Sequence, residues 1–359
     1  MRDLVLVGGG HAHVQVLTSF GKRPMADVRV TLVARDVATP YSGMLPGFVA
    51  GRYSFDDCHI DLTALSARTR TNLVHAEAVG LDRSARLVLL KDKAPLSYDV
   101  LSLDVGAAPD LGVIPGAAEH AVPVKPIAAF GRRWLAFAEQ ARGPQRIVVI
   151  GGGAGGVELA LAIDHRLAEA TVTLVTRDEV LAGHAPAAQR KIRTILAHHG
   201  IRLIEDDLAK RVEAGGVQLA SGERPGADAV FIVTEAAAPR WLAETGLTLD
   251  ERGFVAVAAT LRSSDPTIFA VGDCATVLKH RRPKSGVFAV RQGPPLADNL
   301  RRVLRRENPK PFVPQSRYLA LIGTGDGRAL ATRGSWAIEG AWVWRWKDYL
   351  DRRWMARYR

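Results

Sequence analysis

Two glycine-rich turns, each placed between an apolar run and a helix-compatible segment, constrain the fold of this 359-residue chain more than any other feature. The first turn reads GGGHAH from Gly8, follows the apolar run 4–7 and precedes a second apolar run at 28–33. This spacing predicts a strand–turn–helix–strand unit of the kind that binds a dinucleotide. Gly8 and Gly10 fill the first two glycine positions of the motif, but His13 occupies the third, where a small residue is expected.

The second turn carries the complete pattern. It reads GGGAGG at 151–156, follows the apolar run 146–150 and precedes a helix and another apolar run at 171–175. Its glycines let the backbone approach a pyrophosphate, while the helix N-terminus offers free N–H groups and a partial positive charge. Two such turns predict two dinucleotides bound face to face, ordinarily a flavin and a nicotinamide. The sequence therefore predicts an α/β fold with two Rossmann-like dinucleotide-binding domains.

The strand that follows each turn ends at a basic residue. These residues are Arg35 and Arg177, at positions where an acidic residue would hold an adenosine ribose diol. At the second site, Arg177 could accommodate a 2′-phosphate, which favours NADPH over NADH. A solvent-exposed loop arginine is an equally good reading, so the choice of nicotinamide nucleotide stays open.

Two further segments fit the first nucleotide site. The apolar run 98–105 ends in a small-residue turn that contains Ala107. A later apolar run, 267–271, delivers Gly272 and Asp273 at the start of a helical turn. An aspartate there can accept hydrogen bonds from the ribityl chain of a flavin, and it can also cap the turn.

The order of these segments resembles that of the pyridine nucleotide-disulphide oxidoreductases over nearly the whole chain. Three motifs are more similar to one branch of that family: GGGHAH at 8–13, TPYSGMLPG at 39–47 and RQGPPL at 291–296. The branch is FAD-dependent, is related to the type II NADH dehydrogenases and is often fused ahead of selenide, water dikinase. With no kinase module present, the resemblance implies a stand-alone member.

The resemblance implies a glutathione reductase-like fold whose FAD domain is discontinuous. The implied parts are residues 1–109 and 254–326 for the FAD domain, 110–253 for the NAD(P)H domain and 327–359 for a C-terminal tail. The motifs and the resemblance together predict FAD contacts at Gly8, Gly10, His11, Ala12, Arg35, Ala107, Gly272 and Asp273. The predicted NAD(P)H contacts are Gly151, Gly153, Gly156, Glu158 and Arg177.

The chain does not carry the redox disulfide of the disulphide reductases. Those enzymes place CxxxxC after the second strand of the FAD domain, where this sequence reads TPYSGMLPGF. Cys58 and Cys274 are the two cysteines of the chain, and their separation predicts neither a disulfide nor a metal site. Thiol–disulfide chemistry is therefore not expected, and the cysteine usage fits a cytoplasmic protein.

The expected reaction is direct electron transfer from NAD(P)H through FAD to an acceptor. The cofactors supply the chemistry and the protein positions them. By resemblance, Lys125 lies near the flavin at a hinge and Glu158 lies near the nicotinamide. An exposed linker lysine and a salt-bridged helix glutamate are the alternatives for these two residues.

Residues 287–292 bear on the identity of the electron acceptor. Type II NADH dehydrogenases carry A-Q-x-x-x-Q beside the flavin; here the last glutamine is kept as Gln292 and the first is Phe288. Phe288 could stack on a quinone or close the site to one. A quinone or another small acceptor is expected. The alternatives are a small selenium or sulfur compound, a pathway-specific substrate, or a flavin-bound sensor that responds to NAD(P)H.

The last nineteen residues, 341–359, lack glycine and proline and carry four of the seven tryptophans. They also carry six basic against two acidic residues, so we expect an amphipathic helix. Its predicted apolar face is formed by Val343, Trp346, Leu350 and Trp354. Such a helix suits an anionic membrane surface, and packing on the FAD domain or in a homodimer interface is the alternative.

The net charge of +11 requires a comment, because basic proteins often bind nucleic acid or anionic membranes. All recognisable motifs are for dinucleotides, so no nucleic acid partner is expected. The chain opens with Met-Arg-Asp and a strand-like run rather than a signal peptide. We therefore expect a cytoplasmic protein, peripheral on the inner face of the membrane if the tail binds lipid.

Overall fold

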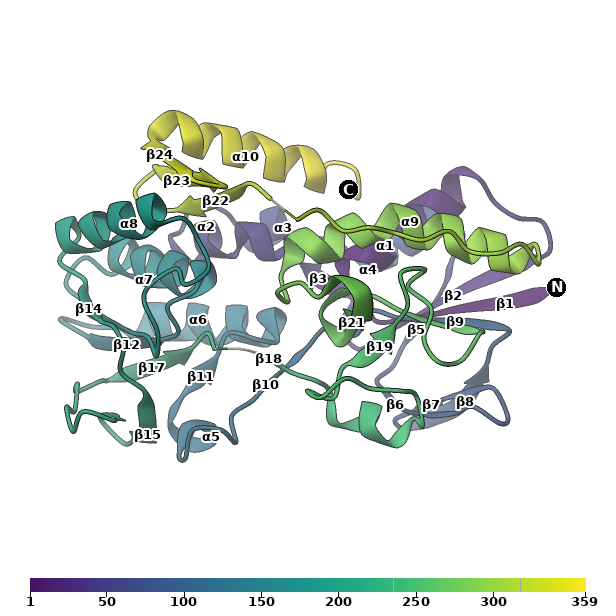
Figure 1. Ribbon diagram of the computed structural model, residues 1–359, viewed down its shortest axis with the longest axis horizontal. Helices are drawn as coiled ribbons and strands as arrows, with labels where there is room; N and C mark the ends of the chain where they lie inside the picture. The colour runs from purple at the N-terminus through teal and green to yellow at the C-terminus, as the bar shows by residue number, and fades with distance from the viewer. Residues whose placement is uncertain (235, 317) are drawn as a thin grey trace.

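The computed structural model describes residues 1–234, 236–316 and 318–359, and two five-stranded parallel sheets form the centres of its two halves (Figure 1). The first sheet has the strand order β20-β9-β1-β2-β5, with every pair parallel. Its strands are β1 (Arg2–Val7), β2 (Val28–Ala34), β5 (Asn72–His75), β9 (Val100–Leu103) and β20 (Ile268–Ala270). Parallel strands covered on both faces need continuous apolar runs, which these segments provide.

The second sheet has the order β11-β17-β12-β13-β14 and is also parallel throughout. Its strands are β11 (Val122–Pro123), β12 (Arg146–Ile150), β13 (Thr171–Val175), β14 (Arg202–Ile204) and β17 (Ala229–Ile232). Helices α6 (Ile127–Gln140), α7 (Ala154–Arg166) and α8 (Pro186–His198) belong to this half. Each glycine-rich turn therefore joins the central strand of a sheet to a helix, as the sequence predicts.

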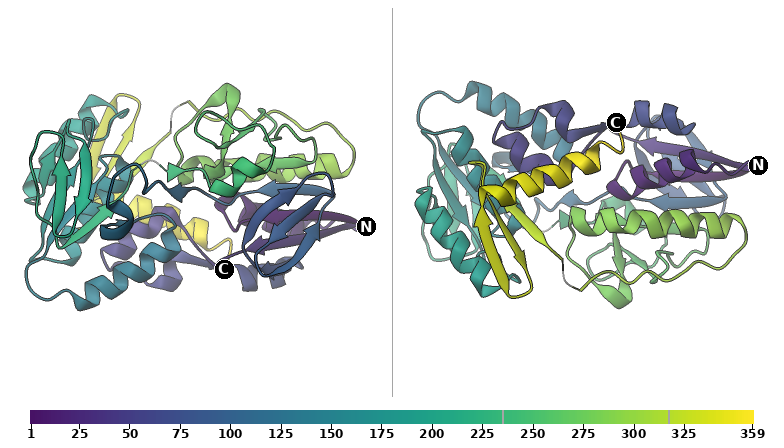
Figure 2. Two further views of the ribbon diagram at one scale, coloured as in Figure 1. Left: turned by 90° about the horizontal axis from the view of Figure 1, so that it is seen from below. Right: turned by 90° about the horizontal axis from the view of Figure 1, so that it is seen from above.

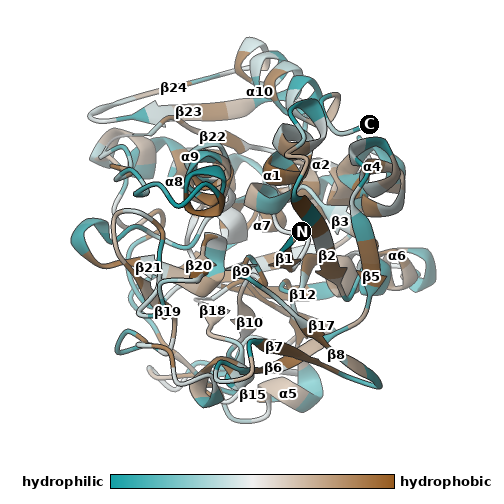
Figure 3. Ribbon diagram, turned by 90° about the vertical axis from the view of Figure 1, so that its right-hand side faces the viewer, coloured by the Kyte–Doolittle hydropathy of each residue, from teal (hydrophilic) through white to brown (hydrophobic). Residues whose placement is uncertain are grey.

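The first sheet is covered on one side by α1 (His11–Lys22), α4 (Leu62–Thr69) and the long helix α9 (Gly286–Leu304). Helices α1 and α9 pack along each other, and Leu17 and Leu300 are both fully buried. Figure 3 shows brown, hydrophobic strands β1 and β2 beneath helices of mixed hydropathy. Burial of one helix face against this sheet supplies the core of the first half.

Smaller elements complete the two halves. An antiparallel sheet is formed by β6 (Ala78–Asp82), β7 (Leu87–Leu90) and β8 (Lys93–Ser97). The two-stranded sheets pair β3 (Ala38–Pro40) with β4 (His59–Asp61), β10 (Ala108–Pro109) with β18 (Ala236–Ala237), β15 (Ala209–Glu213) with β16 (Gly216–Leu219), and β19 (Val255–Val257) with β21 (Ala275–Val277). The short helices are α2 (Leu45–Val49), α3 (Phe55–Cys58) and α5 (Ala117–His120).

The chain ends in a separate antiparallel sheet followed by a helix. The sheet contains β22 (Ala320–Gly323), β23 (Ala329–Arg333) and β24 (Trp336–Gly340), and the helix is α10 (Ala341–Met355). Figure 2 shows α10 in yellow, running from the half that holds the second sheet towards α1 of the first half. The predicted C-terminal helix is thus present, and it spans both halves of the molecule.

The first sheet combines strands that lie before and after the second sheet in the sequence, because β20 pairs with β9. This arrangement agrees with the predicted α/β fold with two Rossmann-like units. The boundaries at 109, 253 and 326 stay a prediction.

Candidate functional site

One cavity of about 1490 Å³ extends from the first glycine-rich turn to the second and to α10. Of the residues predicted to form the site, those that line it are Gly8, Gly10, His11, Arg35, Ala107, Lys125, Glu158 and Asp273. Those that do not line it are Ala12, Gly151, Gly153, Gly156, Arg177, Gly272 and Gln292. The cavity meets the second turn at Ala154 and Gly155 instead.

The first turn needs glycine for steric reasons. Gly8 has a φ of +97°, and a Cβ there would lie 2.3 Å from the carbonyl oxygen of Asp104. A Cβ on Gly10 would lie 2.3 Å from the carboxylate of the same aspartate. The two glycines thus let the turn approach the end of β9 closely and leave its cavity side open.

Asp104 is a buried residue of this turn that sequence reasoning missed. Its Oδ2 accepts hydrogen bonds from the backbone N–H groups of Ala12 at 3.0 Å and His13 at 3.1 Å. Burial raises the pKa of its carboxyl to about 7, and the two N–H groups act in the opposite direction. The signal in the sequence was an acidic residue at the end of an otherwise apolar run, in LSLDVG. The Ala12 N–H therefore already has a partner within the protein.

His13 fills the third position of the first turn with two hydrogen bonds. Its Nδ1 lies 2.7 Å from the carbonyl oxygen of Gly8, and its Nε2 lies 2.8 Å from Oγ of Ser102. A carbonyl oxygen can only accept, so Nδ1 carries the proton and Nε2 accepts from the serine hydroxyl. Burial lowers the pKa of His13 to about 4, so the ring is neutral. The imidazole therefore joins α1 to both β1 and β9.

His11 lies on the cavity and contacts the C-terminal helix. Its ring centroid lies 5.5 Å from that of Tyr41 and 5.5 Å from that of Trp354, and these two rings stack at 4.3 Å. Its Nε2 is buried without a hydrogen-bond partner among the described residues. Burial lowers the pKa of His11 to about 4. A neutral, unpaired ring nitrogen thus lies at the edge of the cavity, where a bound group can satisfy it.

Lys125 and Asp273 form an ion pair on the cavity wall. Lys125 Nζ lies 2.6 Å from Oδ2 of Asp273, and the lysine side chain is 33% exposed. Gln292 lies behind this wall, where its Oε1 accepts the backbone N–H of Gly272 at 2.6 Å. The structure therefore brings Lys125 and Asp273 together, and it places Gln292 as a support of the turn that carries Asp273.

Glu158 belongs to α7 in the half that holds the second sheet, and it lines the cavity. Its Oε1 accepts the backbone N–H of Gly323 at 2.8 Å. Burial raises the pKa of its carboxyl to about 7, and the positive charge of Lys347 partly offsets this rise. Sequence reasoning counted Lys347 among the solvent-facing charges of the tail. It is instead buried, and its Nζ donates to the carbonyl oxygen of Gly43 at 2.5 Å and to Asp351 at 2.7 Å.

The second turn also needs glycine. A Cβ on Gly156 would lie 1.8 Å from the carbonyl oxygen of Gly151, and Gly151 itself has a φ of +128°. A Cβ on Gly153 would meet nothing within 4 Å, so the turn is open at this position. Both arginines at the strand ends are exposed: Arg177 pairs with Asp178 at 3.0 Å, and Arg35 pairs with Asp36 at 3.0 Å.

Phe288 does not line the cavity. It is buried against Tyr318, which does line it, with ring centroids 5.3 Å apart. Phe288 therefore supports a residue of the cavity wall, and its effect on a quinone stays a prediction.

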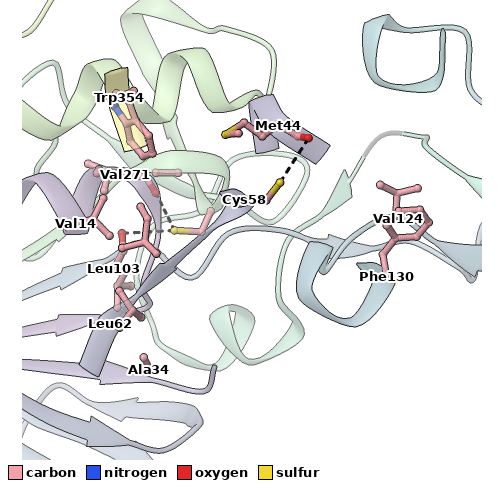
Figure 4. Close-up of a cluster of buried hydrophobic side chains, with 14 of the residues drawn as sticks. Val14, Ala34, Met44, Cys58, Leu62, Leu103, Val124, Phe130, Val271 and Trp354 are labelled. Atoms are coloured by element: carbon pink, nitrogen blue, oxygen red, sulfur yellow. Dashed lines mark hydrogen bonds between the residues drawn. The ribbon is translucent and has the colours of Figure 1, made fainter. Parts of the chain in front are cut away.

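Both cysteines are buried, and Figure 4 shows Cys58 beside Met44. Cys58 Sγ lies 3.9 Å from the carbonyl oxygen of Met44, and Cys274 Sγ lies 3.1 Å from that of Val271. Burial raises the pKa of both thiols to about 12, which disfavours the reactive thiolate. Neither cysteine lines the cavity.

The cavity reaches both glycine-rich turns, as binding of two dinucleotides requires. Gly8 and Gly10 of the first turn and Gly155 of the second line it, and His11 Nε2 is buried without a partner among the described residues. Within the described part of the chain, no group of three or more His, Cys, Asp or Glu is arranged to hold a metal ion. None of the helices formed by these residues is long and apolar enough to cross a membrane.

Comparison with known proteins identifies similar chains. Residues 2–293 match the pyridine nucleotide-disulphide oxidoreductase family. The NADH dehydrogenase-like protein YutJ of Bacillus subtilis is 24% identical over 285 residues, which cover 77% of this chain and 78% of that protein. The nitric oxide reductase FlRd-NAD(+) reductase of Klebsiella pneumoniae is 31% identical over 288 residues, which cover 76% of this chain and 72% of that protein.

Solved structures share the fold. The sulfide:quinone oxidoreductase of Aquifex aeolicus superposes with a TM-score of 0.84 at 18% identity, covering 100% of this chain and 92% of that chain. NDH2 from Plasmodium falciparum, in complex with NADH, gives a TM-score of 0.81 at 14% identity, covering 98% and 97%. These findings confirm the predicted fold class and the predicted resemblance to the family and to NADH dehydrogenase-like proteins. FAD and NAD(P)H are the cofactors of this family, which confirms the cofactor prediction.

Proposed function

Because the chain belongs to the pyridine nucleotide-disulphide oxidoreductase family, it is an NAD(P)H-dependent flavoprotein oxidoreductase, and we propose that its acceptor is a quinone or another small molecule. The observation that carries this proposal is the single cavity that joins the two glycine-rich turns to α10. For a quinone, the overall reaction is NAD(P)H + H⁺ + quinone → NAD(P)⁺ + quinol. No protein nucleophile is needed for this reaction.

We assign the residues of the cavity by position. Gly8, Gly10 and Asp273 would hold FAD, and the open second turn would hold the pyrophosphate of NAD(P)H. When bound, FAD supplies the electron-accepting ring. Lys125 holds the carboxylate of Asp273 in position through the 2.6 Å ion pair, and the carboxylate oxygens can accept hydrogen bonds from hydroxyl groups.

Glu158 and its neighbours shape the face of the cavity opposite the first turn. With its pKa raised to about 7, Glu158 can hold or release a proton near neutral pH. The ammonium of Lys347 lies close enough to lower that pKa, so α10 adjusts the protonation of Glu158. We propose that Glu158 contacts the nicotinamide ribose or holds a proton during turnover.

Two observations support an acceptor other than a disulfide. Both thiols are buried away from the cavity, and their pKa is raised to about 12. Thiolate attack on a disulfide requires an accessible thiol with a lower pKa. An acceptor that takes electrons directly needs only access to the cavity.

The central experiment is anaerobic reduction of the purified yellow protein by NADH and by NADPH in separate cuvettes. We expect bleaching of the flavin absorbance by at least one of them, and then recovery of the absorbance when a quinone is added. Disulfide compounds should not restore the colour. A colourless protein that neither retains nor rebinds FAD would overturn the proposal, as would flavin that is reduced but not reoxidised by any small acceptor.

We also propose that α10 contacts an anionic membrane surface. Four side chains on its outer side are more than one third exposed: Trp342, Trp346, Tyr349 and Leu350. Trp342 and Trp346 stack with ring centroids 6.4 Å apart, and the exposed Arg345 lies between them in the sequence. Exposed indoles with surrounding cations are typical of helices that lie in the headgroup layer. A peripheral position on the inner face of the membrane follows if this contact forms.

A further inference from the structure

Three arginines line the cavity at the end that α10 reaches. Arg291 belongs to α9, Arg353 belongs to α10, and Arg357 lies two residues after the end of α10. All three are exposed. In the described part of the chain, no carboxylate lies within 4.0 Å of any of their guanidinium groups, whereas Arg352 pairs with Asp348 at 2.9 Å. We call these three residues the arginine rim.

The segments that carry the arginine rim meet near His11. Trp354, between Arg353 and Arg357 in the sequence, stacks on the His11 ring at 5.5 Å. Gln15 Nε2 donates to the carbonyl oxygens of His11 at 3.1 Å and of Val290 at 2.5 Å, and Arg291 is the next residue after Val290. The C-terminal end of α10, the start of α1 and the first half of α9 therefore meet at one mouth of the cavity.

The positive charge of this mouth is not balanced from within the protein. Asp351 is the acidic residue of α10 that lines the cavity, and its charge is matched by Lys347 at 2.7 Å. Two other lining carboxylates, Asp36 and Glu77, lie within ion-pair distance of Arg35, next to the end of β2. Arg353 donates to the hydroxyl of Tyr349 at 3.2 Å. Among the described residues, the guanidinium groups of the arginine rim therefore have no carboxylate partner and present their positive charge towards whatever enters from this side.

Aromatic side chains also line the cavity near the arginine rim. Tyr41 and Trp354, stacked at 4.3 Å, line the same mouth beside the partnerless Nε2 of His11. Guanidinium groups bind carboxylate, sulfonate and phosphate oxygens in a bidentate manner, and aromatic walls suit a planar ring. A ligand that matches both features is a planar ring with an anionic substituent.

We propose that the arginine rim selects an acceptor that carries a negative charge, such as an acidic quinone, and draws it into the cavity beside His11. This inference rests on the proposed function and names the class of substrate for the same site. A neutral quinone would use the aromatic wall alone. An anionic quinone would use the wall and the arginines together, so it binds more tightly, and added salt weakens its binding.

The test measures binding to the oxidised, FAD-loaded protein without any reductant. A naphthoquinone sulfonate is the anionic probe and menadione is the neutral probe, and each is titrated while the flavin spectrum is followed. We expect the sulfonate to bind at least about tenfold more tightly at low salt, since one or two guanidinium contacts have this magnitude. Its affinity should fall about tenfold between about 20 mM and about 500 mM NaCl, while that of menadione stays constant.

Substitutions in the arginine rim test whether these arginines cause the preference for the anionic probe. Arg353→Gln with Arg357→Gln should weaken sulfonate binding by about tenfold or more, with menadione unchanged. Arg345→Gln is the matched control, because Arg345 is exposed on the same helix and does not line the cavity. The ratio of FAD to protein confirms that each variant is folded and loaded. Equal affinity for the two probes in the native protein would overturn the inference, as would equal loss in the control.

Two additional measurements separate the inference from its rivals. Reoxidation by menadione tests the proposed function, so a protein that turns over menadione and shows no charge preference refutes the inference alone. Binding to phosphatidylglycerol vesicles tests whether the rim serves a lipid headgroup. If the rim variants lose vesicle binding and keep their sulfonate affinity, the arginines recognise lipid and the inference is wrong.

Discussion

His13 shows how one side chain can replace the packing role of a small residue. In the usual motif, the third position is small so that the helix can lie close to the strand. Here the ring is fully buried and hydrogen-bonds Gly8 and Ser102 at its two nitrogens. The ring thus holds α1, β1 and β9 together through directed bonds, at a position where close van der Waals contact would otherwise do so.

The first prediction concerns the serine that completes this arrangement. Ser102→Ala leaves Nε2 of His13 buried without a donor, so we expect a loss of about 1–3 kcal/mol in the free energy of unfolding. Ser66→Ala is the control, because Ser66 is equally buried and its Oγ has no hydrogen-bond partner among the described residues. Urea denaturation of the FAD-loaded proteins measures both values. Equal losses for the two variants would contradict this account of His13.

The second prediction uses the carboxyl of Glu158. Its pKa rises from 4.5 to about 7 on folding, so the folded protein holds a proton that the unfolded chain releases in this interval. Stability therefore falls as the pH rises through this window, by about 3 kcal/mol from this group. Glu158→Gln cannot titrate. The free energy of unfolding of the variant relative to the native protein should therefore rise by about 2–3 kcal/mol from about pH 5 to about pH 8.

Chemical denaturation at the two pH values tests this expectation. The exposed residue Glu119 offers a control, since Glu119→Gln should give the same difference at both values. A pH-independent difference for Glu158→Gln would show that the carboxyl titrates at its ordinary pKa.

At this scale, the sequence singled out Gly8 and Gly10 because they belong to a contiguous motif. The atoms that would exclude a side chain at these two positions belong to the distant Asp104, which the motif does not contain. Asp104 and Lys347 were missed because their surroundings are built by distant segments. Nothing near Lys347 in the sequence indicates that the carbonyl of Gly43 will lie 2.5 Å from its ammonium group.

Helix α10 shows what sequence periodicity can predict for an element. The helix itself was expected, and Val343 and Trp354 are buried as expected. Trp346 and Leu350 were assigned to the same apolar face, but they are 37% and 39% exposed. The buried Lys347–Asp351 pair lies on the side of the helix that faces the protein, so Trp346 and Leu350 lie on a side that is partly exposed. A hydropathy pattern treats such charges as solvent-facing, so the orientation could not be predicted.

The third prediction concerns this buried pair. Asp351→Leu leaves the Lys347 ammonium buried with the Gly43 carbonyl as its remaining hydrogen-bond partner in the described structure, so we expect a loss of about 3–5 kcal/mol. Lys347→Met combined with Asp351→Leu removes both charges and should recover most of that loss. Thermal unfolding of the single and double variants measures the recovery. A double variant as unstable as Asp351→Leu would show that the pair contributes through its shape and not through its charges.

At the scale of the whole molecule, the two glycine-rich turns predicted two Rossmann-like units, because each turn carries its own strand and helix and a parallel strand needs a crossover to its neighbour. The return of the chain to the first sheet was implied by the resemblance to the family. The position of α10 could not be predicted from the glycine-rich turns, because no motif links it to a strand of either sheet. Residues of α10 contact Tyr41 and His11 of the first half, while its side chains also influence Glu158 of the second half. One helix thereby completes the wall of the cavity.

This arrangement divides α10 between two tasks. The inner side, with Lys347, Asp351 and Trp354, is committed to the body of the protein. The outer side leaves Trp342 and Trp346 free to enter a headgroup layer without any loss of internal packing. Membrane contact and cavity closure are therefore compatible, and they can be separated by substitution.

The fourth prediction follows from that division. Trp342→Ser with Trp346→Ser should reduce co-sedimentation with vesicles rich in phosphatidylglycerol by about tenfold or more, because two indoles leave the interface. The same variant should keep its FAD content and its rate of flavin reduction, since neither tryptophan lines the cavity. Trp336→Ser is the matched control, because Trp336 is 45% exposed on β24, outside the helix.

The vesicle-binding result for the double variant indicates the route by which the acceptor reaches the cavity. Loss of vesicle binding confined to the double variant would place the cavity mouth at the lipid surface, since Leu350 belongs to both the exposed row and the cavity wall. An acceptor could then enter from the headgroup layer and would meet the arginines of the rim on its way. Equal vesicle binding by the native protein and the double variant would remove the membrane from this account. The acceptor would then have to reach the cavity from water, and the charge of the rim would be the remaining means of attracting it.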